Sequence, residues 1–368
     1  MKALKIVVRI LLSVFLFTAT AAAAVLLFLF FSPTVGRVPD KNERNILSRR
    51  SEHCSEGEFR NESAVPAMTG EARYSGERKV PEKKLPAQKP SFSDALLEDG
   101  LSFTWLGHSS FFLQMGNVNI LVDPVLSERC SPVGFAGPAR FSELPLTAEE
   151  LPRIDALFLS HDHYDHLDYR TIRTIGDRVG TVVVPLGMDS ILTGWGVDKG
   201  KIRTLDYWES TVIDGVTFIL TPSQHFSGRN PLRRNRTLWG GVYLNNGNNR
   251  VYYTGDGGYS GVFAAVRERL GTPTLMISEC GQYDPAWAKM HMFPEETVKA
   301  ALDAGAERLI PVHWGAFCIC NHDWDDPIRR VSAAAETVGL PLSTPQIGRT
   351  VTLSDLDSCT EHWWEACR

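Results

Sequence analysis

The sequence predicts an α/β fold of two mixed β-sheets with helices on their outer faces, preceded by a transmembrane helix. Two observations predict the sheets and their cover. A β-meander opens the globular part of the 368-residue chain, and strands then alternate with helices, twice over. That succession is typical of sheets layered beneath helices. The third observation is an uncharged, mostly apolar stretch over residues 10–31, which is long enough to cross a bilayer as a helix.

Residues 1–33 are expected to be a membrane anchor or a signal segment. Lys2, Lys5 and Arg9 precede the apolar run, so the positive-inside rule keeps this end in the cytoplasm and exports the rest. Small residues from Ala19 to Ala24 would suit signal cleavage, but the apolar run continues beyond them and is long for a signal. We therefore expect an uncleaved, single-pass anchor with the globular part on the extracytoplasmic (periplasmic) side.

Residues 34–98 are expected to form a polar linker, because they are rich in Lys, Arg, Glu, Ser and Pro and lack sustained apolar periodicity. Such a segment can reach from a membrane to a domain, or it can hold ordered structure against the domain, and the sequence leaves both open. Residues 99–353 form the predicted globular domain and 354–368 a C-terminal tail. Trp363 and Trp364 in this tail could lie at a membrane interface or cover the core.

Residue patterning predicts the elements of the domain in order. The meander strands cover residues 102–106, 111–115 and 117–123, and later strands cover 156–159, 181–185, 202–205, 239–244, 250–254, 274–278, 308–312 and a short run ending at 353. A hairpin over 209–220 turns at Asp214-Gly215. Helices are expected over 169–178, 187–193, 262–270, 294–304 and 327–338. Pro294 and Gly305 mark the ends of the fourth helix.

The composition excludes some classes of protein. A net charge of −5, with 43% hydrophobic and 22% charged residues, gives no sign of a nucleic-acid partner. The seven cysteines are an odd number at irregular spacings, which excludes a zinc-ribbon framework. In an exported domain, Cys359 could pair with Cys367, or either with Cys54. Cys130 and Cys280 fit better as small buried residues.

The densest chemistry lies in residues 160–168, which carry three histidines and three aspartates directly after an apolar run. We expect this stretch to be a loop at the end of a buried strand. Alternate residues of an extended loop point the same way, so His161 and His163 can face one point. Asp165 and His166 come where the loop can turn and face a second point. Imidazole favours Zn, Fe, Ni or Cu, and carboxylate can bridge metals or orient a metal-bound water.

Three more metal-type residues follow strand-like runs, namely His225, Asp256 and His313. Together with the four in the loop they suit two metal ions that share one carboxylate. Asp256 is the natural bridge, because the glycines on either side let the backbone come close. Such a pair holds a hydroxide and lowers its pKa, so that it can attack carbon or phosphorus in a substrate.

The His-x-His-x-Asp-His order, followed by a His, a Gly-Asp and a final His, resembles the metallo-β-lactamase superfamily. Within it, several strings resemble the N-acylphosphatidylethanolamine-hydrolysing phospholipase D group. These strings are Trp105-Leu106-Gly107-His108, residues 160–168, Pro222-Ser223-Gln224-His225, Leu238-Trp239-Gly240, Gly255-Asp256-Gly257-Gly258-Tyr259 and His313-Trp314-Gly315-Ala316-Phe317. The resemblance implies an αβ/βα sandwich and makes residues 99–353 a metallo-hydrolase domain.

The resemblance also implies roles. His161, His163 and His225 would hold one Zn²⁺, Asp165, His166 and His313 a second, and Asp256 both, although other divalent transition metals would also fit. The group cleaves a phosphodiester to release phosphatidic acid and an N-acylethanolamine, so a phospholipid or another phosphodiester is the expected substrate. Asp165, Asp256 and His291 are the expected catalytic residues. His291 precedes a Pro-Glu-Glu helix start, as in the group, and can contact substrate there; a helix-capping or surface histidine is the alternative.

For other residues near the motifs, the sequence supports weaker predictions of their roles. Asp123 is expected to accept a hydrogen bond from a ligand histidine. His108 could act in the same way or be structural. Arg229, Arg233, Arg234 and Arg236 could bind a substrate phosphate or form a solvated loop, and His322 is expected to be structural or exposed. Two alternative functions remain open: a carboxylic-ester or lactone hydrolase on the same fold, and a non-catalytic, metal-stabilised envelope protein.

Overall fold

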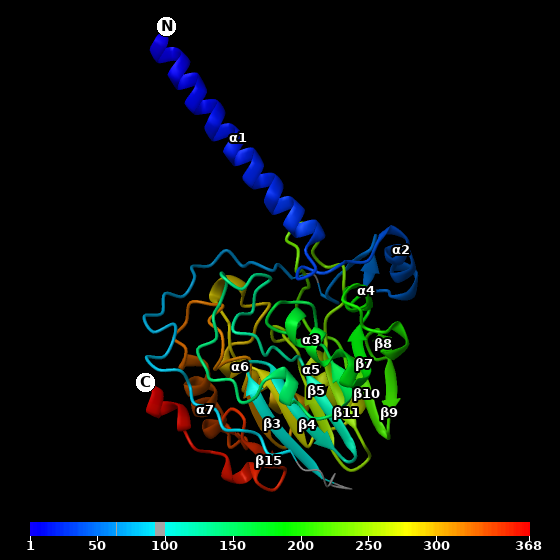
Figure 1. Ribbon diagram of the computed structural model, residues 1–368. Helices are drawn as coiled ribbons and strands as arrows, with labels where there is room; N and C mark the ends of the chain where they lie inside the picture. Colours follow the sequence, from blue (N-terminus) through cyan, green and yellow to red (C-terminus); the bar gives the residue numbers. More distant parts are fainter. Residues whose placement is uncertain (64, 93–99) are drawn as a thin grey trace.

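Two mixed β-sheets form the body of the protein (Figure 1). The structure, a computed structural model, describes residues 1–63, 65–92 and 100–368. The first sheet has the strand order β15-β3-β4-β5-β6-β7-β8 and the second the order β14-β13-β12-β11-β10-β9. Each sheet combines antiparallel and parallel pairs, as the meander and the later strand–helix alternation predict.

The seven-stranded sheet consists of β3 (Leu101–Gly107), β4 (Ser110–Met115), β5 (Val118–Val122), β6 (Ile154–Phe158), β7 (Val179–Pro185), β8 (Ile202–Leu205) and β15 (Thr350–Thr352). Side chains alternate across it, as the strand period requires. Phe111 and Leu113 of β4 face the space between the sheets, where Phe111 meets Tyr253 of the other sheet with ring centroids 5.1 Å apart. Phe112 faces outward, into a second cluster that includes α3 (Tyr169–Ile175) and α4 (Asp189–Gly194).

The six-stranded sheet consists of β9 (Ser210–Ile213), β10 (Val216–Thr221), β11 (Gly241–Asn245), β12 (Arg250–Tyr253), β13 (Leu275–Glu279) and β14 (Leu309–Val312). The helices α5 (Val262–Leu270), α6 (Pro294–Ala304) and α7 (Asp326–Val338) pack side by side, and α6 contacts β13. Apolar residues of all three helices, such as Val266, Ala301 and Val331, join the core cluster of this sheet. The predicted sandwich of two mixed sheets with outer helices is therefore confirmed.

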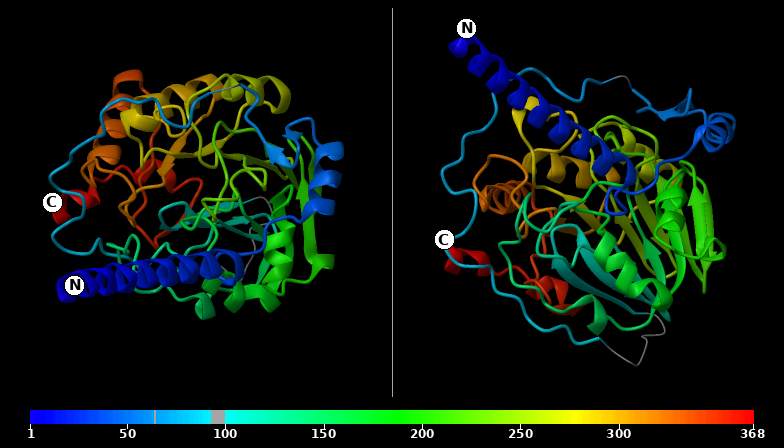
Figure 2. Two further views of the ribbon diagram at one scale, coloured as in Figure 1. Left: turned by 90° about the horizontal axis from the view of Figure 1, so that it is seen from above. Right: turned by 45° about the horizontal axis from the view of Figure 1, so that its top comes forward.

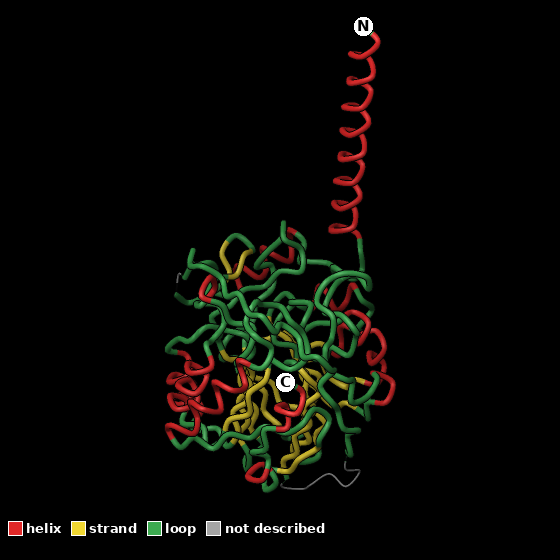
Figure 3. Tube along the Cα trace, turned by 90° about the vertical axis from the view of Figure 1, so that its left-hand side faces the viewer, coloured by secondary structure: helices red, strands yellow, loops and turns green. Residues whose placement is uncertain are grey.

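The N-terminal helix α1 (Lys2–Phe31) stands apart from the body (Figures 1 and 3). Its span Leu4–Phe31 has a mean hydropathy of 2.5 and none of the most apolar window is buried. By length and composition this helix can cross a membrane, although a signal sequence would meet the same criteria. The strand-end loops gather at the end of the body from which α1 leaves (Figure 3).

The segment that follows α1 is ordered and wraps around the outside of the body (Figure 2). We call residues 34–63 and 65–92 the belt. It contains α2 (Lys41–Arg50) and a small hairpin, β1 (Cys54–Ser55) with β2 (Glu58–Phe59). Phe59 and Leu85 are fully buried in the core of the body, and Gln88 N–H donates to Ile347 O. Of the two readings of the polar linker, the ordered one holds for these residues; position 64 and positions 93–98 lie outside the described part.

The C-terminal tail covers the core, which was one of the two readings of Trp363 and Trp364. Trp364 is fully buried, with its ring centroid 5.7 Å from that of Trp314, and Trp363 stacks on the same ring at 5.9 Å. All seven cysteines lie among the described residues and all are free thiols, so the pairings considered for Cys54, Cys359 and Cys367 are absent there.

Candidate metal centre

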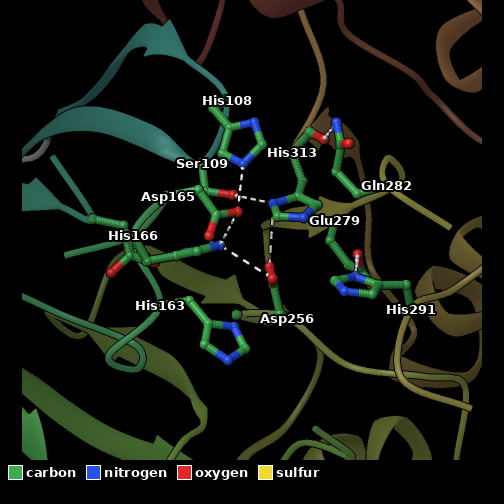
Figure 4. A network of polar contacts seen from close by, with 12 residues as sticks. His108, Ser109, His163, Asp165, His166, Asp256, Glu279, Gln282, His291 and His313 are labelled. Carbon is green, nitrogen blue, oxygen red and sulfur yellow. Dashed lines mark hydrogen bonds and ion pairs between the residues drawn. The ribbon is translucent and has the colours of Figure 1, made fainter. Parts of the chain in front are cut away.

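The seven metal-type residues predicted from the sequence lie together at the carboxyl ends of four strands (Figure 4 shows five of them). The loop after β6 carries His161, His163, Asp165 and His166, while His225, Asp256 and His313 follow β10, β12 and β14. Both sheets present these strand ends at one edge, so residues far apart in sequence meet there. A donor set of five imidazoles and two carboxylates suits divalent transition metals.

One half of the cluster consists of His161, His163 and His225. The Nε2 atom of His161 lies 2.9 Å from Nδ1 of His163, which in turn lies 3.3 Å from Nε2 of His225. Their ring nitrogens therefore converge on one point, as the alternation along the loop predicts for the first two.

The other half consists of Asp165, His166 and His313, with His108 beside them. The two halves meet at Asp256, whose Oδ2 lies 3.1 Å from His166 Nε2 and 3.8 Å from His161 Nε2. Its Oδ1 lies 3.3 Å from His313 Nδ1. Asp256 is thus the residue that touches both halves.

The glycines around Asp256 let its loop approach other backbone segments. A Cβ atom at Gly255 would lie 2.7 Å from Gly240 O, and one at Gly258 would lie 2.1 Å from Lys289 O. Gly255 also has a φ of +61°, a conformation that side chains disfavour. The loop could not keep this course with larger residues at these positions.

A second layer of hydrogen bonds orients the cluster. The Nδ1 of His166 lies 2.8 Å from Asp123 Oδ2, which confirms the predicted role of Asp123. His225 Nδ1 donates to Met290 O at 3.0 Å. His108 Nε2 lies 2.9 Å from Asp165 Oδ2, so His108 also supports a member of the cluster. Such contacts fix which ring nitrogen or oxygen remains free for a metal.

Three residues of the centre adopt a backbone conformation that is rare for residues other than glycine. The φ angles are +53° for His108, +41° for Asp123 and +68° for His313. Conformations of this kind are less stable by about 1–3 kcal/mol each and persist where the surrounding structure enforces them. Their concentration here indicates that the fold holds this cluster in place against local preference.

The charge balance of the cluster fits bound cations. Among the described residues, the ion pairs of Asp123, Asp165 and Asp256 are all with histidines, and no Lys or Arg neutralises them. The buried atoms His166 Nε2 and Asp256 Oδ1 have no hydrogen-bond partner among the residues that the structure describes. Buried carboxylates without compensating charge are strongly destabilising. Metal ions between these atoms would supply that charge.

Burial lowers the pKa of His161, His225 and His313 well below the ordinary value, so these rings are neutral, which is the form that binds metals. Burial also acts to lower the pKa of His166, but the adjacent carboxylates, Asp256 foremost, outweigh it and raise that pKa. The carboxylates favour the protonated form of His166, because no Lys or Arg forms an ion pair with them among the described residues. A cation could take the place of that proton.

Glu279, at the end of β13, is a functional candidate that sequence analysis missed. It is fully buried, its Oε2 lies 2.8 Å from Nδ1 of His291, and its Oε1 accepts the Met292 N–H at 2.9 Å. Burial raises the pKa of Glu279 above its ordinary value; burial acts to lower the pKa of His291, but the Glu279 carboxylate outweighs it and raises that pKa. The signal available in the sequence was a glutamate at the end of an apolar, strand-like run.

A cavity of about 410 Å³ opens over the centre. His163, Asp165, Asp256, His291 and His313 line its polar floor. Its walls are largely apolar and include Met68, Phe226, Trp287, Met290 and Ile319, and Arg234 adds a guanidinium. Met68 belongs to the belt, so the belt is part of the cavity wall. A cavity with a polar floor and apolar walls suits an amphipathic substrate.

Two of the four arginines that follow His225 have structural partners. Arg229 is 4% exposed, and its guanidinium donates to Asp162 O, Leu167 O, Thr34 O and Val35 O at 2.7–3.0 Å, so the phosphate-binding reading is wrong for this residue. Arg236 donates to Gly57 O and pairs with Glu58 of the belt. His322 is also structural, because its Nε2 accepts the Gln282 N–H at 3.1 Å.

The bonds of Arg229 predict a large effect on stability. We expect Arg229→Met to lower the free energy of unfolding by about 2–4 kcal/mol, because two carbonyls of the loop after β6 and two carbonyls of the belt lose their donor. Chemical denaturation of full-length protein in detergent would measure it. Arg233→Met is the matched control, since Arg233 is exposed and its guanidinium lies over the Phe30 ring at 4.3 Å. Equal stability of the two variants would contradict the assigned role of Arg229.

Fold and site together define a metal-dependent hydrolase. The "Beta-lactamase superfamily domain" family matches residues 118–314. An uncharacterized protein of Mycobacterium tuberculosis is 39% identical over 286 residues, which cover 76% of this chain and 75% of that protein. The N-acyl-phosphatidylethanolamine-hydrolyzing phospholipase D 1 of Caenorhabditis elegans is 32% identical over 261 residues, 68% of this chain and 73% of that protein.

A solved structure agrees at the level of the fold. The structure of a possible metal-dependent hydrolase from Veillonella parvula is similar with a TM-score of 0.56 and 20% identity, over 68% of this chain and 99% of that one. The chain thus belongs to the metallo-β-lactamase superfamily, and its homologues include N-acylphosphatidylethanolamine-hydrolysing phospholipases D.

Proposed function

We propose that the protein is a dinuclear zinc hydrolase that cleaves a phosphodiester in an N-acylphosphatidylethanolamine-type phospholipid. One zinc ion would be held by His161, His163 and His225, the other by Asp165, His166 and His313, and both by Asp256; other divalent transition metals would fit the same atoms. Bound metals of this kind lower the pKa of water and polarise a phosphoryl oxygen. The carrying observation is that all seven residues converge beneath one amphipathic cavity.

Three observations favour a phospholipid over a soluble substrate. The C. elegans relative carries a phospholipase D name for this lipid class. The cavity offers apolar walls for acyl chains above a polar floor. The exposed helix α1 would keep the enzyme at a membrane, which we propose it crosses once, with the domain on the extracytoplasmic side because basic residues precede the apolar run of the helix.

The chain's own groups have separate tasks at the floor. Asp165, oriented by His108, can accept a hydrogen bond from the attacking water. His291 lines the cavity, and because its Nδ1 is held by Glu279, its Nε2 is the ring nitrogen left to donate to a phosphoryl or leaving-group oxygen. Arg234, with its guanidinium 4.6 Å over the Phe226 ring, can attract the phosphate charge from the wall.

If Glu279 orients His291, the variant Glu279→Gln should lower kcat by about 10- to 100-fold. The amide keeps the shape of the side chain but loses the charge that favours the imidazolium. Metal content should stay unchanged, since Glu279 is not among the proposed ligands. Glu296→Gln serves as the control, because Glu296 accepts the Phe293 N–H at a helix start and, within the part of the chain that the structure describes, forms no hydrogen bond with His291. A normal kcat in Glu279→Gln would exclude this role.

The substrate is tested with purified, zinc-loaded full-length protein in detergent. We expect release of phosphatidic acid from N-acylphosphatidylethanolamine, and no release by His163→Ala. A parallel panel of lactones and carboxylic esters distinguishes the alternative hydrolase. Turnover of the panel alone would replace the phosphodiester assignment. Inactivity of the metal-loaded protein on both groups of substrates would favour a non-catalytic protein.

A further inference from the structure

The helix α1 ends directly on the body, with no spacer between them. Asn230 Nδ2 donates to Leu29 O at 2.8 Å, and Trp195 Nε1 donates to Pro33 O at 2.6 Å. The buried Arg229 then holds the carbonyls of Thr34 and Val35. If α1 crosses a bilayer, these bonds leave no slack, and the end of the body that holds the helix must lie against the membrane surface.

Two loops that meet the base of α1 also reach the cavity over the metal centre. In the loop over residues 228–236, Asn230 bonds to α1, whereas Arg234 lines the cavity. In the loop over residues 127–138, the part from 127 to 134 shares a small hollow with Thr34, and Pro138 lines the cavity. The mouth of the cavity and the base of α1 therefore belong to one face of the body, the end where the loops gather (Figure 3).

Four large apolar side chains are exposed on loops of this face. Phe135 is 86% exposed, Leu232 60%, Met68 51% and Ile319 42%. Single exposed apolar residues are ordinary on soluble proteins, and the described part of the body has others, such as Val212 on β9 and Val338 on α7. The four differ because Met68 and Ile319 line the cavity, while Phe135 and Leu232 lie on the two loops at the base of α1.

Basic groups accompany these apolar side chains. Arg129, which is half-buried, and Arg233, which is exposed, lie on the same two loops. Arginines near a membrane surface are attracted to anionic lipids. Apolar side chains flanked by arginines are the chemistry of a surface that enters the headgroup layer.

We propose that this face, which we call the mouth face, docks into the bilayer that α1 spans, with Phe135, Leu232, Met68 and Ile319 inserted among the lipids. The proposal rests on the membrane anchor and lipid substrate of the proposed function. It adds that a lipid enters the cavity from the leaflet itself and does not cross water. Residues of the mouth face would thus contact the lipid before the lipid reaches the metal centre.

The test uses the full-length protein reconstituted in vesicles of phosphatidylcholine and phosphatidylglycerol. A fluorescent amino acid is placed at position 135 or 232 of the mouth face, at the exposed control positions 212 or 338, or at position 16 inside α1. Some of the lipid carries a nitroxide near the headgroup. We expect the nitroxide to quench the fluorescence of probes at positions 135 and 232 at least about twofold more than that of probes at positions 212 and 338. Inserted side chains reach the acyl boundary, where the nitroxide lies close.

Each other outcome overturns the docking and separates it from the function. Equal quenching at all four body positions, with quenching at position 16, would mean that α1 crosses the bilayer while the mouth face stays in water. Absence of quenching at position 16 would remove the anchor, and the docking with it. Phosphatidic acid release, measured on the wild-type protein in detergent, reports the hydrolase independently of both results.

Discussion

Replacing Asp256 with asparagine should abolish hydrolysis, with a loss of about 1,000-fold or more in kcat. Asp256 is the residue that lies between the two halves of the centre, with His166 Nε2 3.1 Å from one oxygen and His313 Nδ1 3.3 Å from the other. The amide keeps the volume but removes the negative charge and one acceptor. We therefore expect the variant to bind less than the wild-type complement of metal, as measured by elemental analysis of the purified protein.

Asp155→Asn is the matched control. Asp155 is also a buried aspartate, but it lies at the start of β6, where its Oδ2 accepts the Asn119 N–H at 2.9 Å. This variant should keep its metal and its kcat and should lose only about 1 kcal/mol of stability. If Asp256→Asn retained both metal and turnover, the proposed sharing of Asp256 between two ions would be wrong.

The sequence predicts the sandwich well because its strands and helices have strong local signals. The helices over 262–270 and 294–304 have the predicted bounds, and the hairpin turns at Asp214-Gly215. The candidate site could also be predicted from the sequence, because each metal-type residue lies in a loop that follows a strand. Strand ends of one sheet edge converge in space, so position along the chain was enough to predict proximity.

Other features depend on contacts that no local pattern encodes. The belt is polar overall and reads as a spacer, yet its buried Phe59 and Leu85 fasten it to the body. Arg229 lies among arginines that suggest a phosphate site, but its partners are backbone carbonyls of distant segments. The role proposed for Glu279 depends on its contact with His291, which the local pattern of the strand does not encode.

Removal of metal should both inactivate the protein and destabilise it. The carboxylates of Asp123, Asp165 and Asp256 share a buried site with histidines as their sole ion-pair partners among the described residues. A ligand that binds only the folded state contributes RT ln(1 + [L]/Kd), or about 2.7 kcal/mol at 100 times Kd. We expect a strong chelator to abolish turnover and to lower the Tm of the full-length protein by several degrees.

Readdition of zinc should restore both turnover and Tm, and parallel readdition of iron or manganese identifies the metal that the centre prefers. The variant Asp256→Asn provides the control, because a centre that already binds less metal should show a smaller loss of Tm on chelation. The Tm of Asp155→Asn should fall as far as that of the wild type. A chelated wild-type protein with unchanged Tm and turnover would show that the cluster is stable and active without metal, and the hydrolase mechanism proposed here would have to be abandoned.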